Sequence, residues 1–212
     1  MQQDKNIGII GAGGQAREVA QYLKSDGVPL AFFAVHLEYL TTDSSKIDLL
    51  SPSEDERAIS VVAAIGSPGL RRKLVEEWSG ENFTNIITRN SYVGGTVKMG
   101  VGCIVSPFAV LTTDVSLGDH ILINTGATVS HDCKLGDYAT ISPGAHIAGN
   151  VDIGRGVFVG IGATISNGVK IAEGSVIGAG AVVLHDVLEE NSVVVGVPAK
   201  TIRLNEGWLD EL

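Results

Sequence analysis

The sequence predicts two architectures in one chain: an α/β unit over residues 1–88, then a parallel β-helix over residues 89–203, with a short tail over residues 204–212. Three observations support this division. Apolar strands alternate with amphipathic helices before residue 88, and an aliphatic residue returns at every sixth position from Val93 onward. The chain also holds 27 glycines among 212 residues, without the every-third spacing of collagen. Glycines in that number belong to a short structural repeat.

The α/β unit begins with a buried strand that enters a glycine turn, in the segment NIGIIGAGG. The residues that follow, QAREVAQYLKSDG, have the period of an amphipathic helix that stops at Gly27 and Pro29. LAFFAV and AISVVAAIG are expected to form the second and third strands. The polar segment from His36 to Arg57, which contains Ser-Pro-Ser, is expected to be a mobile connection.

A second helix follows the third strand. Ser67 and Pro68 are an N-cap and a first-turn residue, and the apolar residues behind them share one helix face: Leu70, Leu74 and Trp78. NFTNIIT supplies a last short strand before the repeats. The resulting βαβαβ order predicts a small, Rossmann-like parallel sheet.

The repeats keep a strict register of six residues over sixteen aliphatic positions. These are Val93, Met99, Val105, Leu111, Leu117, Ile123, Val129, Leu135, Ile141, Ile147, Ile153, Val159, Ile165, Ile171, Ile177 and Val183. Such a register excludes a helical period and is typical of a parallel β-helix, in which each repeat is a short strand and a turn. Three repeats close one triangular coil, so residues 18 apart stack at the strand spacing of roughly 4.8 Å. Residues 93–188 then form a little over five coils.

The composition narrows the possible partners. A formal net charge of −9, with no cluster of Lys and Arg, argues against a nucleic-acid or anionic membrane surface, because basic residues must meet the phosphates there. A small molecule or another copy of the chain fits better. No signal peptide opens the sequence, no apolar run is long enough to cross a bilayer, and Cys103 and Cys133 are expected to be buried free thiols. A reduced, cytoplasmic setting is therefore expected.

The glycine turn satisfies a loose dinucleotide-binding pattern. Gly11, Gly13 and Gly14 allow close backbone approach, and the helix that follows presents its N-terminus to a phosphate. A complete dinucleotide fold needs two such halves, and the residues before the repeats provide one. A mononucleotide or a nucleotide-linked sugar therefore fits better than NAD. The alternative is a turn that only packs the helix against the strand.

The βαβ unit, the unbroken repeats, the segment INTGATVSHDC and the ending VVVGVPAKTIR together resemble one family. It is the family of sialic-acid O-acetyltransferases and UDP-4-amino-sugar N-acetyltransferases, the NeuD/PglD type. The resemblance covers residues 5–203. It implies a left-handed β-helix and a homotrimer with three active sites between subunits. It also implies acetyl-CoA as co-substrate along the prism, no metal, and a nucleotide sugar held by the N-terminal domain.

The resemblance places the chemistry on His131 and Asp132. Acetyl transfer needs a base for the acceptor's proton and a donor that stabilises the oxygen as negative charge develops. An imidazole titrates near neutral pH, and a carboxylate can orient it, but adjacent strand residues point to opposite faces, so their contact needs a corner geometry. Adding 18 to 131 places Gly149 one coil above His131, and the family's oxyanion-stabilising backbone amide falls at the matching glycine.

The resemblance also implies binding residues. For the acceptor these are Gly11, Gly13, Gly14, Gln15, Arg71 and Asn124, and for acetyl-CoA they are Gly149, Gly160, Gly162, Ala179 and Lys200. An internal asparagine ladder is the alternative for Asn124. The chain departs from its relatives at Gln15, where a histidine is common, at Ala34, where an acidic residue is common, and at Thr140, where a member has a second histidine.

The other histidines are weaker candidates. His185 has the same phase as His131, three coils further on, but it lies where the repeats fail and is expected to be a surface residue that ends a coil. His146 is expected to be solvated or at an interface, and His120 and His36 have no supporting context. The sequence shows no metal cluster and no Ser-His-Asp order, so direct attack by the acceptor is favoured over an acyl-enzyme.

The leading hypothesis is an acetyl-CoA-dependent acetyltransferase that acts on a nucleotide-linked amino sugar in surface glycan or polysaccharide synthesis. One alternative is O-acetylation of sialic acid or of another sugar hydroxyl. A third is an inactive trimeric scaffold, because the N-terminal motif is altered at Gln15 and Ala34.

Overall fold

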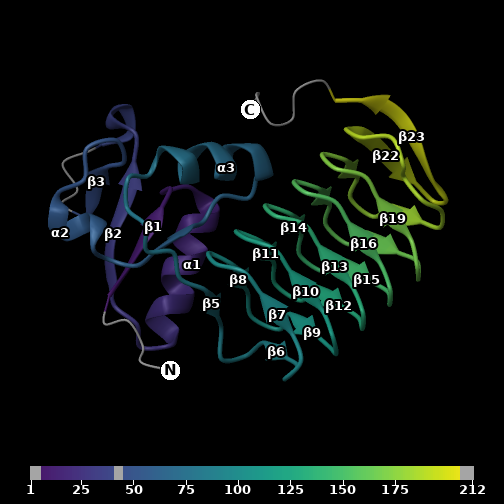
Figure 1. Ribbon diagram of the computed structural model, residues 1–212, viewed down its shortest axis with the longest axis horizontal. Helices are drawn as coiled ribbons and strands as arrows, with labels where there is room; N and C mark the ends of the chain where they lie inside the picture. The colour runs from purple at the N-terminus through teal and green to yellow at the C-terminus, as the bar shows by residue number, and fades with distance from the viewer. Residues whose placement is uncertain (1–5, 41–44, 206–212) are drawn as a thin grey trace.

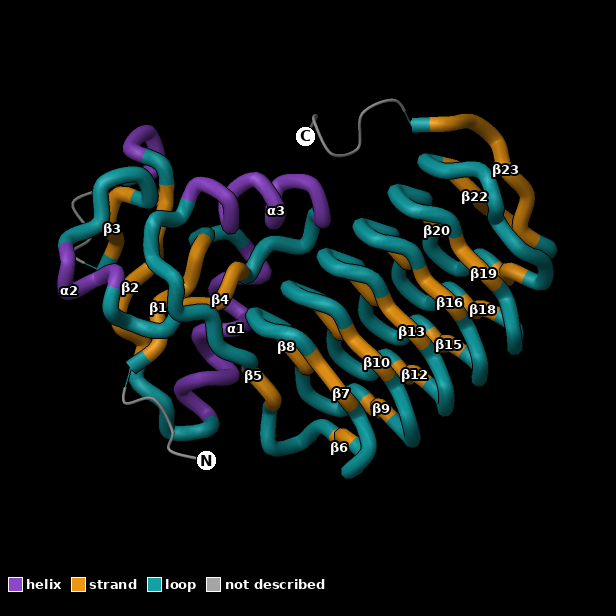
Figure 2. Tube along the Cα trace, viewed as in Figure 1, coloured by secondary structure: helices purple, strands orange, loops and turns teal. Residues whose placement is uncertain are grey.

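The computed structural model describes residues 6–40 and 45–205, which form two regions side by side (Figure 1). A sheet with helices lies at the N-terminal side, and a stack of regular coils makes up the remainder (Figure 2). Most of the tail expected over residues 204–212 lies outside the described residues. Among the described residues, none of the helices combines the length and the apolar character that a membrane crossing requires.

The N-terminal sheet has four parallel strands in the order β3-β2-β1-β4. Their bounds are β1 Ile7–Ile10, β2 Leu30–Val35, β3 Lys46–Asp48 and β4 Val61–Ala63. Three of them are the strands that the sequence predicts. The fourth, β3, lies within the segment from His36 to Arg57, which the sequence analysis expects to be a mobile connection and for which it predicts no strand. That segment also contains a 3-10 helix, η1 (Leu37–Tyr39), and the short helix α2 (Glu54–Arg57), while residues 41–44 are not described.

Two helices lie on opposite sides of this sheet. α1 (Gly14–Ser25) packs with Ile7 and Ile9 in one apolar cluster, while α3 (Pro68–Glu77) packs with Ile10 in another. This arrangement follows from the alternation of side chains along a strand. Ser67 is the N-cap of α3 and Pro68 is its first residue, as the sequence predicts.

The coils form three sheets around one core, and all their strands are parallel except β23. The eight-stranded sheet contains β5 (Ile86–Ile87), β8 (Ile104–Val105), β11 (Leu122–Ile123), β14 (Thr140–Ile141), β17 (Phe158–Val159), β20 (Val176–Ile177), β22 (Ser192–Gly196) and β23 (Ala199–Leu204). The six-stranded sheet contains β6 (Tyr92–Val93), β9 (Val110–Leu111), β12 (Thr128–Val129), β15 (His146–Ile147), β18 (Thr164–Ile165) and β21 (Val182–Val183). The five-stranded sheet contains β7 (Lys98–Met99), β10 (Ser116–Leu117), β13 (Lys134–Leu135), β16 (Asp152–Ile153) and β19 (Lys170–Ile171).

The register within these sheets confirms the predicted stacking of residues 18 apart, as in the pairs Leu122 with Thr140 and Thr128 with His146. Fourteen of the sixteen predicted aliphatic residues are buried, and Val93 and Met99 at the first coil are half-buried against the same core. Cys103 and Cys133 are buried free cysteines, also as predicted. Burial raises the pKa of Cys103 to about 11, so its thiol stays protonated at neutral pH.

The segment NFTNIIT differs from its prediction. Phe83 makes a single bridge to Val61 of the N-terminal sheet, but β5 pairs with β8 and belongs to the coils. The stack thus begins at Ile86, one strand earlier than the aliphatic register indicates. At the far end, β22 and β23 form an antiparallel hairpin that closes it.

Each edge of the prism is a column of four-residue turns between two sheets, and we name each edge after one residue. The Asn124 edge includes residues 124–127 and leads from the eight-stranded to the six-stranded sheet. The His131 edge includes residues 130–133 and leads from the six-stranded to the five-stranded sheet. The His120 edge includes residues 118–121 and leads back to the eight-stranded sheet.

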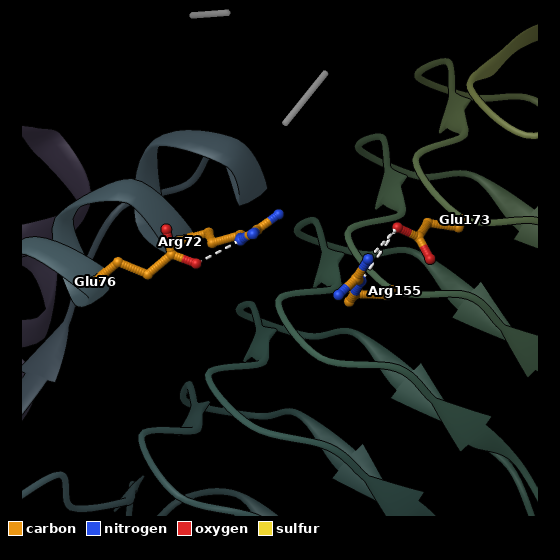
Figure 3. A network of polar contacts seen from close by, with 4 residues as sticks. All are labelled: Arg72, Glu76, Arg155 and Glu173. Atoms are coloured by element: carbon orange, nitrogen blue, oxygen red, sulfur yellow. Dashed lines mark hydrogen bonds and ion pairs between the residues drawn. The ribbon is translucent and has the colours of Figure 1, made fainter. Parts of the chain in front are cut away.

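The N-terminal region docks on the outer face of the eight-stranded sheet and on the His120 edge. α1 shares an apolar cluster with Ile104 and Leu122, whose side chains face outward from the coils. α3 lies near the His120 edge, as Figure 3 shows with the surface ion pairs Arg72–Glu76 on the helix and Arg155–Glu173 on successive coils. Neither pair links the helix to the coils, so the docking depends on the buried contacts of the N-terminal region.

Candidate active site

The His131 edge carries a paired histidine and aspartate. His131 Nδ1 lies 2.8 Å from Asp132 Oδ2, and both side chains are about half exposed. Asp132 has a φ of 60°, in the left-handed region, so its side chain leaves the alternating pattern of a strand and lies beside that of His131. This is the corner geometry that the contact needs. It leaves Nε2 of the imidazole as the atom that can accept a proton.

Gly149 lies one coil above His131, as the register predicts. The Asn150 N–H donates to the His131 carbonyl at 2.9 Å, which fixes the two turns against each other. A Cβ on Gly149 would lie 2.5 Å from both Cε1 and Nε2 of His131. The imidazole therefore occupies the space that the side chain of any other residue at position 149 would need. In the described part of the chain, the Gly149 N–H has no hydrogen-bond acceptor, so this donor is free beside Nε2.

The glycine turn has the shape that its sequence implies. Gly11 has a φ of 100°, which a side chain would strain, and its N–H donates to the Ala34 carbonyl. α1 begins directly after Gly13, whose N-cap position has no side chain to cover the first N–H groups of the helix. A Cβ on Gly13 or Gly14 would meet no atom within 4 Å. Both glycines are exposed, so the start of the helix is accessible.

Gln15 and Asn124 meet, although they come from different regions of the chain. The Asn124 side-chain Nδ2 donates to Gln15 Oε1 at 3.2 Å, and Asn124 Oδ1 accepts the Thr125 N–H at 2.9 Å. Tyr22 of α1 adds a contact of 3.4 Å between its hydroxyl and Thr125 Oγ1. The structure thus joins two predicted acceptor residues beside the glycine turn. Sequence reasoning did not single out Tyr22 or Thr125, because only the docking of α1 brings them together.

These two groups of residues lie on different edges of the prism. Gln15 meets Asn124 on the Asn124 edge, whereas His131 and Gly149 lie on the His131 edge, on the other side of the six-stranded sheet. In the described residues of one chain, the structure does not connect the predicted acceptor group with the predicted base.

Arg71 lies in a different environment from the other predicted acceptor residues. Its side chain is 1% exposed, and all three guanidinium nitrogens donate to protein oxygens on or near the His120 edge. The acceptors are the carbonyls of Ile65, Gly66, His120, Tyr138 and Ala139 and the Thr140 hydroxyl. Burial lowers the pKa of Arg71 to about 9. The structure gives Arg71 a docking role, and its contact with an acceptor stays a prediction.

Thr140, at the position where a member of the family has a second histidine, belongs to the same docking contact. Its hydroxyl donates to the Gly66 carbonyl at 2.9 Å and accepts from Arg71. Thr140 is buried on β14 of the eight-stranded sheet, whereas His131 lies on the edge between the other two sheets.

The predicted acetyl-CoA residues are spread over the coils. Gly160, Gly162 and Ala179 lie in turns of the Asn124 edge, where a Cβ on Gly160 would come within 2.7 Å of Ala179 N. Gly162 has a φ of 66° and open space around it. Lys200 is exposed on β23 at the end of the stack. A single chain does not gather these residues around Gly149.

The remaining histidines occupy varied sites. Asp186, next to His185, accepts the Lys170 N–H at 2.8 Å, so this pair differs from His131 and Asp132. His146 is exposed, with Nδ1 at 2.9 Å from Thr128 Oγ1.

His36 and His120 each contact neighbouring side chains. His36 Nε2 lies 2.7 Å from Glu77 Oε2. His120 is buried between the rings of Phe83 and Tyr138, with centroid distances of 4.7 and 5.2 Å. Desolvation lowers the pKa of His120. The described residues include no group of three or more His, Cys, Asp and Glu side chains that could hold a metal ion.

Comparison with known proteins shows which family the chain belongs to. The family model of bacterial transferase hexapeptides (six repeats) matches residues 150–185. No curated protein sequence matches the chain. Among solved structures, the acetyltransferase domain of PglB from Neisseria gonorrhoeae shares 30% sequence identity at a TM-score of 0.84, covering 93% of this chain and 100% of that one.

Two further solved structures are similar over nearly the whole chain. A variant of perosamine N-acetyltransferase from Caulobacter crescentus, solved in complex with CoA and GDP-perosamine, shares 32% identity at a TM-score of 0.83, covering 92% of this chain and 96% of that one. WeeI from Acinetobacter baumannii shares 28% identity at a TM-score of 0.80, with 92% and 99% covered. With its coils, its repeat register and relatives of this identity and coverage, the chain belongs to the family of hexapeptide-repeat sugar acetyltransferases.

Proposed function

We propose that the protein transfers an acetyl group from acetyl-CoA to the amine of a nucleotide-linked amino sugar. One observation carries the proposal: His131, oriented by Asp132, places its free Nε2 against Gly149, whose N–H is also free. A base beside an unused backbone donor is what direct acyl transfer requires. The solved relatives support the choice of ligands, since one is an N-acetyltransferase with CoA and GDP-perosamine and another was solved with acetyl coenzyme A.

The reaction then has one covalent exchange at the thioester carbon. The acceptor nitrogen attacks the carbonyl carbon and forms the new C–N bond, while His131 Nε2 takes the proton from that nitrogen. Asp132 stabilises the imidazolium, and the Gly149 N–H stabilises the negative oxygen of the tetrahedral intermediate. When the C–S bond breaks, CoA leaves as a thiolate and takes the proton from the imidazolium. The products are the amide and the free CoA thiol.

The glycine turn supports a nucleotide on the acceptor. Exposed glycines at the start of α1 and uncovered N–H groups at its first turn suit a phosphate, and the Gln15 and Asn124 amides meet next to this turn. These neutral side chains can hydrogen-bond a nucleotide or a sugar without a charge preference. We therefore assign the acceptor to the Asn124 edge and to the Rossmann-like N-terminal sheet.

A homotrimer follows from this assignment. The acceptor group and the base lie on different edges of one prism, so a neighbouring copy must bring its His131 edge to the Asn124 edge of the first. Three-fold symmetry repeats this contact three times. We propose a left-handed β-helix with acetyl-CoA between adjacent prisms, along Gly149, Gly160, Gly162 and Ala179 and ending near Lys200. A cytoplasmic location, with its acetyl-CoA supply, fits this reaction.

Release of the CoA thiol tests the proposal. Acetyl-CoA is incubated with a panel of UDP- and GDP-linked amino sugars, with sialic acid and other hydroxyl sugars as the comparison. The proposal expects release with at least one amino sugar and no release with the hydroxyl sugars. Release with a hydroxyl sugar alone would make the protein an O-acetyltransferase, and no release with any acceptor would favour an inactive scaffold.

A further inference from the structure

A third side chain converges on the Gly149 turn from the coil above. Asn167 holds the same turn position as His131 and Gly149, and the Gly168 N–H donates to the Gly149 carbonyl at 2.9 Å. The Asn167 Oδ1 lies 3.1 Å from the point that a Cβ on Gly149 would occupy, and His131 Nε2 lies 2.5 Å from the same point. Nε2 and Oδ1 are therefore at most 5.6 Å apart, the sum of those two distances.

The His120 edge shows what this turn position does elsewhere in the solenoid. There the N–H of Val101 donates to the Asp119 carboxylate one coil above, and the N–H of Asp119 donates to the Asp137 carboxylate one coil above that. Both distances are 2.9 Å. An acidic residue at this position therefore caps the N–H of the coil below.

The turns of the His131 edge have the same length, but a different type of side chain stands at this position. Asn167 stands where the capping aspartate would stand, and the Gly149 N–H below it stays free. No hydrogen bond holds either end of the Asn167 carboxamide among the described residues, and the side chain is exposed. Its amide can therefore rotate about χ2 and present Nδ2 in place of Oδ1.

We propose that Asn167 is a second oxyanion donor, which hydrogen-bonds the acetyl carbonyl oxygen together with the Gly149 N–H. This inference rests on the proposed acetyl transfer and adds a residue to it. A neutral carboxamide suits the position for two reasons. A carboxylate would cap the Gly149 N–H, as Asp119 caps Val101, and its negative charge would repel the oxygen of the tetrahedral intermediate.

Two substitutions test the assignment in the full-length protein, with acetyl-CoA and the acceptor that wild-type protein uses. Asn167→Ala is expected to lower kcat on the order of 10²-fold and to leave the KM for acetyl-CoA within about threefold, because the donor acts on charge that develops in the transition state. Asn167→Asp is expected to lower kcat further. It should also move the acid limb of the kcat/KM profile to higher pH, because a carboxylate near Nε2 stabilises the imidazolium.

Thr113→Ala is the matched control. Thr113 holds the same turn position one coil below His131, its side chain is exposed, and its backbone carbonyl accepts the Asp132 N–H at 3.0 Å. Turnover of this variant should equal that of wild-type protein. Thermal unfolding of all three variants shows whether any loss of turnover comes from loss of the fold.

The outcomes separate the two proposals. If Asn167→Ala keeps kcat within about threefold of wild type, or changes only the KM for acetyl-CoA, Asn167 is no oxyanion donor while the acetyl transfer stands. If Asn167→Asp leaves the pH profile of kcat/KM unchanged, the side chain at position 167 does not lie near His131, and the assignment is also overturned. If wild-type protein transfers acetyl to no acceptor, the proposed function fails and the Asn167 role fails with it.

Discussion

The His131 edge and the His120 edge are built from the same four-residue turn, and each carries a histidine, yet the two differ in what covers them. His131 is exposed beside Asp132 and a free N–H, whereas His120 is buried between Phe83 and Tyr138 under the N-terminal region. The turn N–H groups of the His120 edge are capped by aspartates, and its carbonyls are bound by Arg71. The same backbone turn therefore carries the proposed catalytic residues where it is exposed and contacts the N-terminal region where it is covered.

This contrast predicts two kinds of effect, a loss of turnover and a loss of stability. Substitutions of the proposed catalytic residues on the His131 edge should lower turnover and leave stability unchanged, because their side chains are exposed. Substitutions on the His120 edge should lower stability and leave the chemical step of the folded protein unchanged. Each variant below is therefore measured for both quantities.

The largest effect is expected for His131→Ala. Loss of the general base should lower kcat by roughly 10²-fold or more, while the melting temperature and acetyl-CoA binding stay as in wild-type protein. Thiol release and calorimetry with CoA measure these quantities. His185→Ala, at the same turn position three coils away, is the control. If His131→Ala keeps most of its activity while His185→Ala loses it, the base has been placed on the wrong coil.

Arg71→Leu tests the contact between α3 and the His120 edge. Its removal leaves several buried carbonyls without a donor, so the free energy of unfolding should fall by roughly 3 kcal/mol. Denaturant unfolding measures this change, and the kcat of the protein that stays folded should match wild type. Arg72→Leu, next to it on the exposed side of α3, should change stability by less than about 1 kcal/mol. An increase in the acceptor KM without loss of stability would support the predicted role of Arg71 in acceptor binding.

Gly13→Val probes the open turn at the other end of the proposed site. The structure has room for the side chain, so the fold should survive, but the new methyl groups stand where a phosphate would approach the start of α1. The KM for the acceptor should rise about tenfold, while acetyl-CoA affinity stays unchanged. Calorimetry with the free nucleotide and with CoA distinguishes the two ligands. Unchanged nucleotide binding would mean that the turn only packs the helix against the strand.

The smallest effect is a pH dependence of stability at His120. Desolvation lowers its pKa in the folded state below the ordinary value of 6.5, so the unfolded chain binds the proton more tightly. The contribution of His120 to the free energy of unfolding is fully present above pH 6.5. It is lost as the pH falls through the lower pKa that His120 has in the folded state. The groups that face it are Asp119, Asp137 and Arg71. Denaturant unfolding between pH 7 and 5 should show a weaker pH dependence for His120→Phe than for wild-type protein.

The sequence predicted the coils well because their rule is strict. An aliphatic residue every sixth position admits one register, and that register alone places Gly149 above His131. It could not predict that His131 contacts Asp132, because the contact depends on a left-handed φ at a residue that is not glycine.

The N-terminal region was harder to predict in detail. β3 is three half-buried residues in a polar segment, so its apolar pattern is weak. Arg71 matched an arginine of the family by its position in the sequence, but its partners are main-chain carbonyls whose places depend on how α3 docks. Side-chain roles that arise from docking leave no periodic signal in the chain.

Mixed oligomers test most directly the claim that one subunit's His131 edge completes another's acceptor site. His131→Ala and Gly13→Val subunits are co-expressed in equal amounts and assayed at an acceptor concentration well below KM. If the site lies between subunits, about a quarter of the sites in randomly mixed trimers combine an intact histidine with an intact glycine turn, and activity returns to about that fraction of wild type. If the site lies within one subunit, the mixture is no more active than the average of its two parents, and the shared site is contradicted.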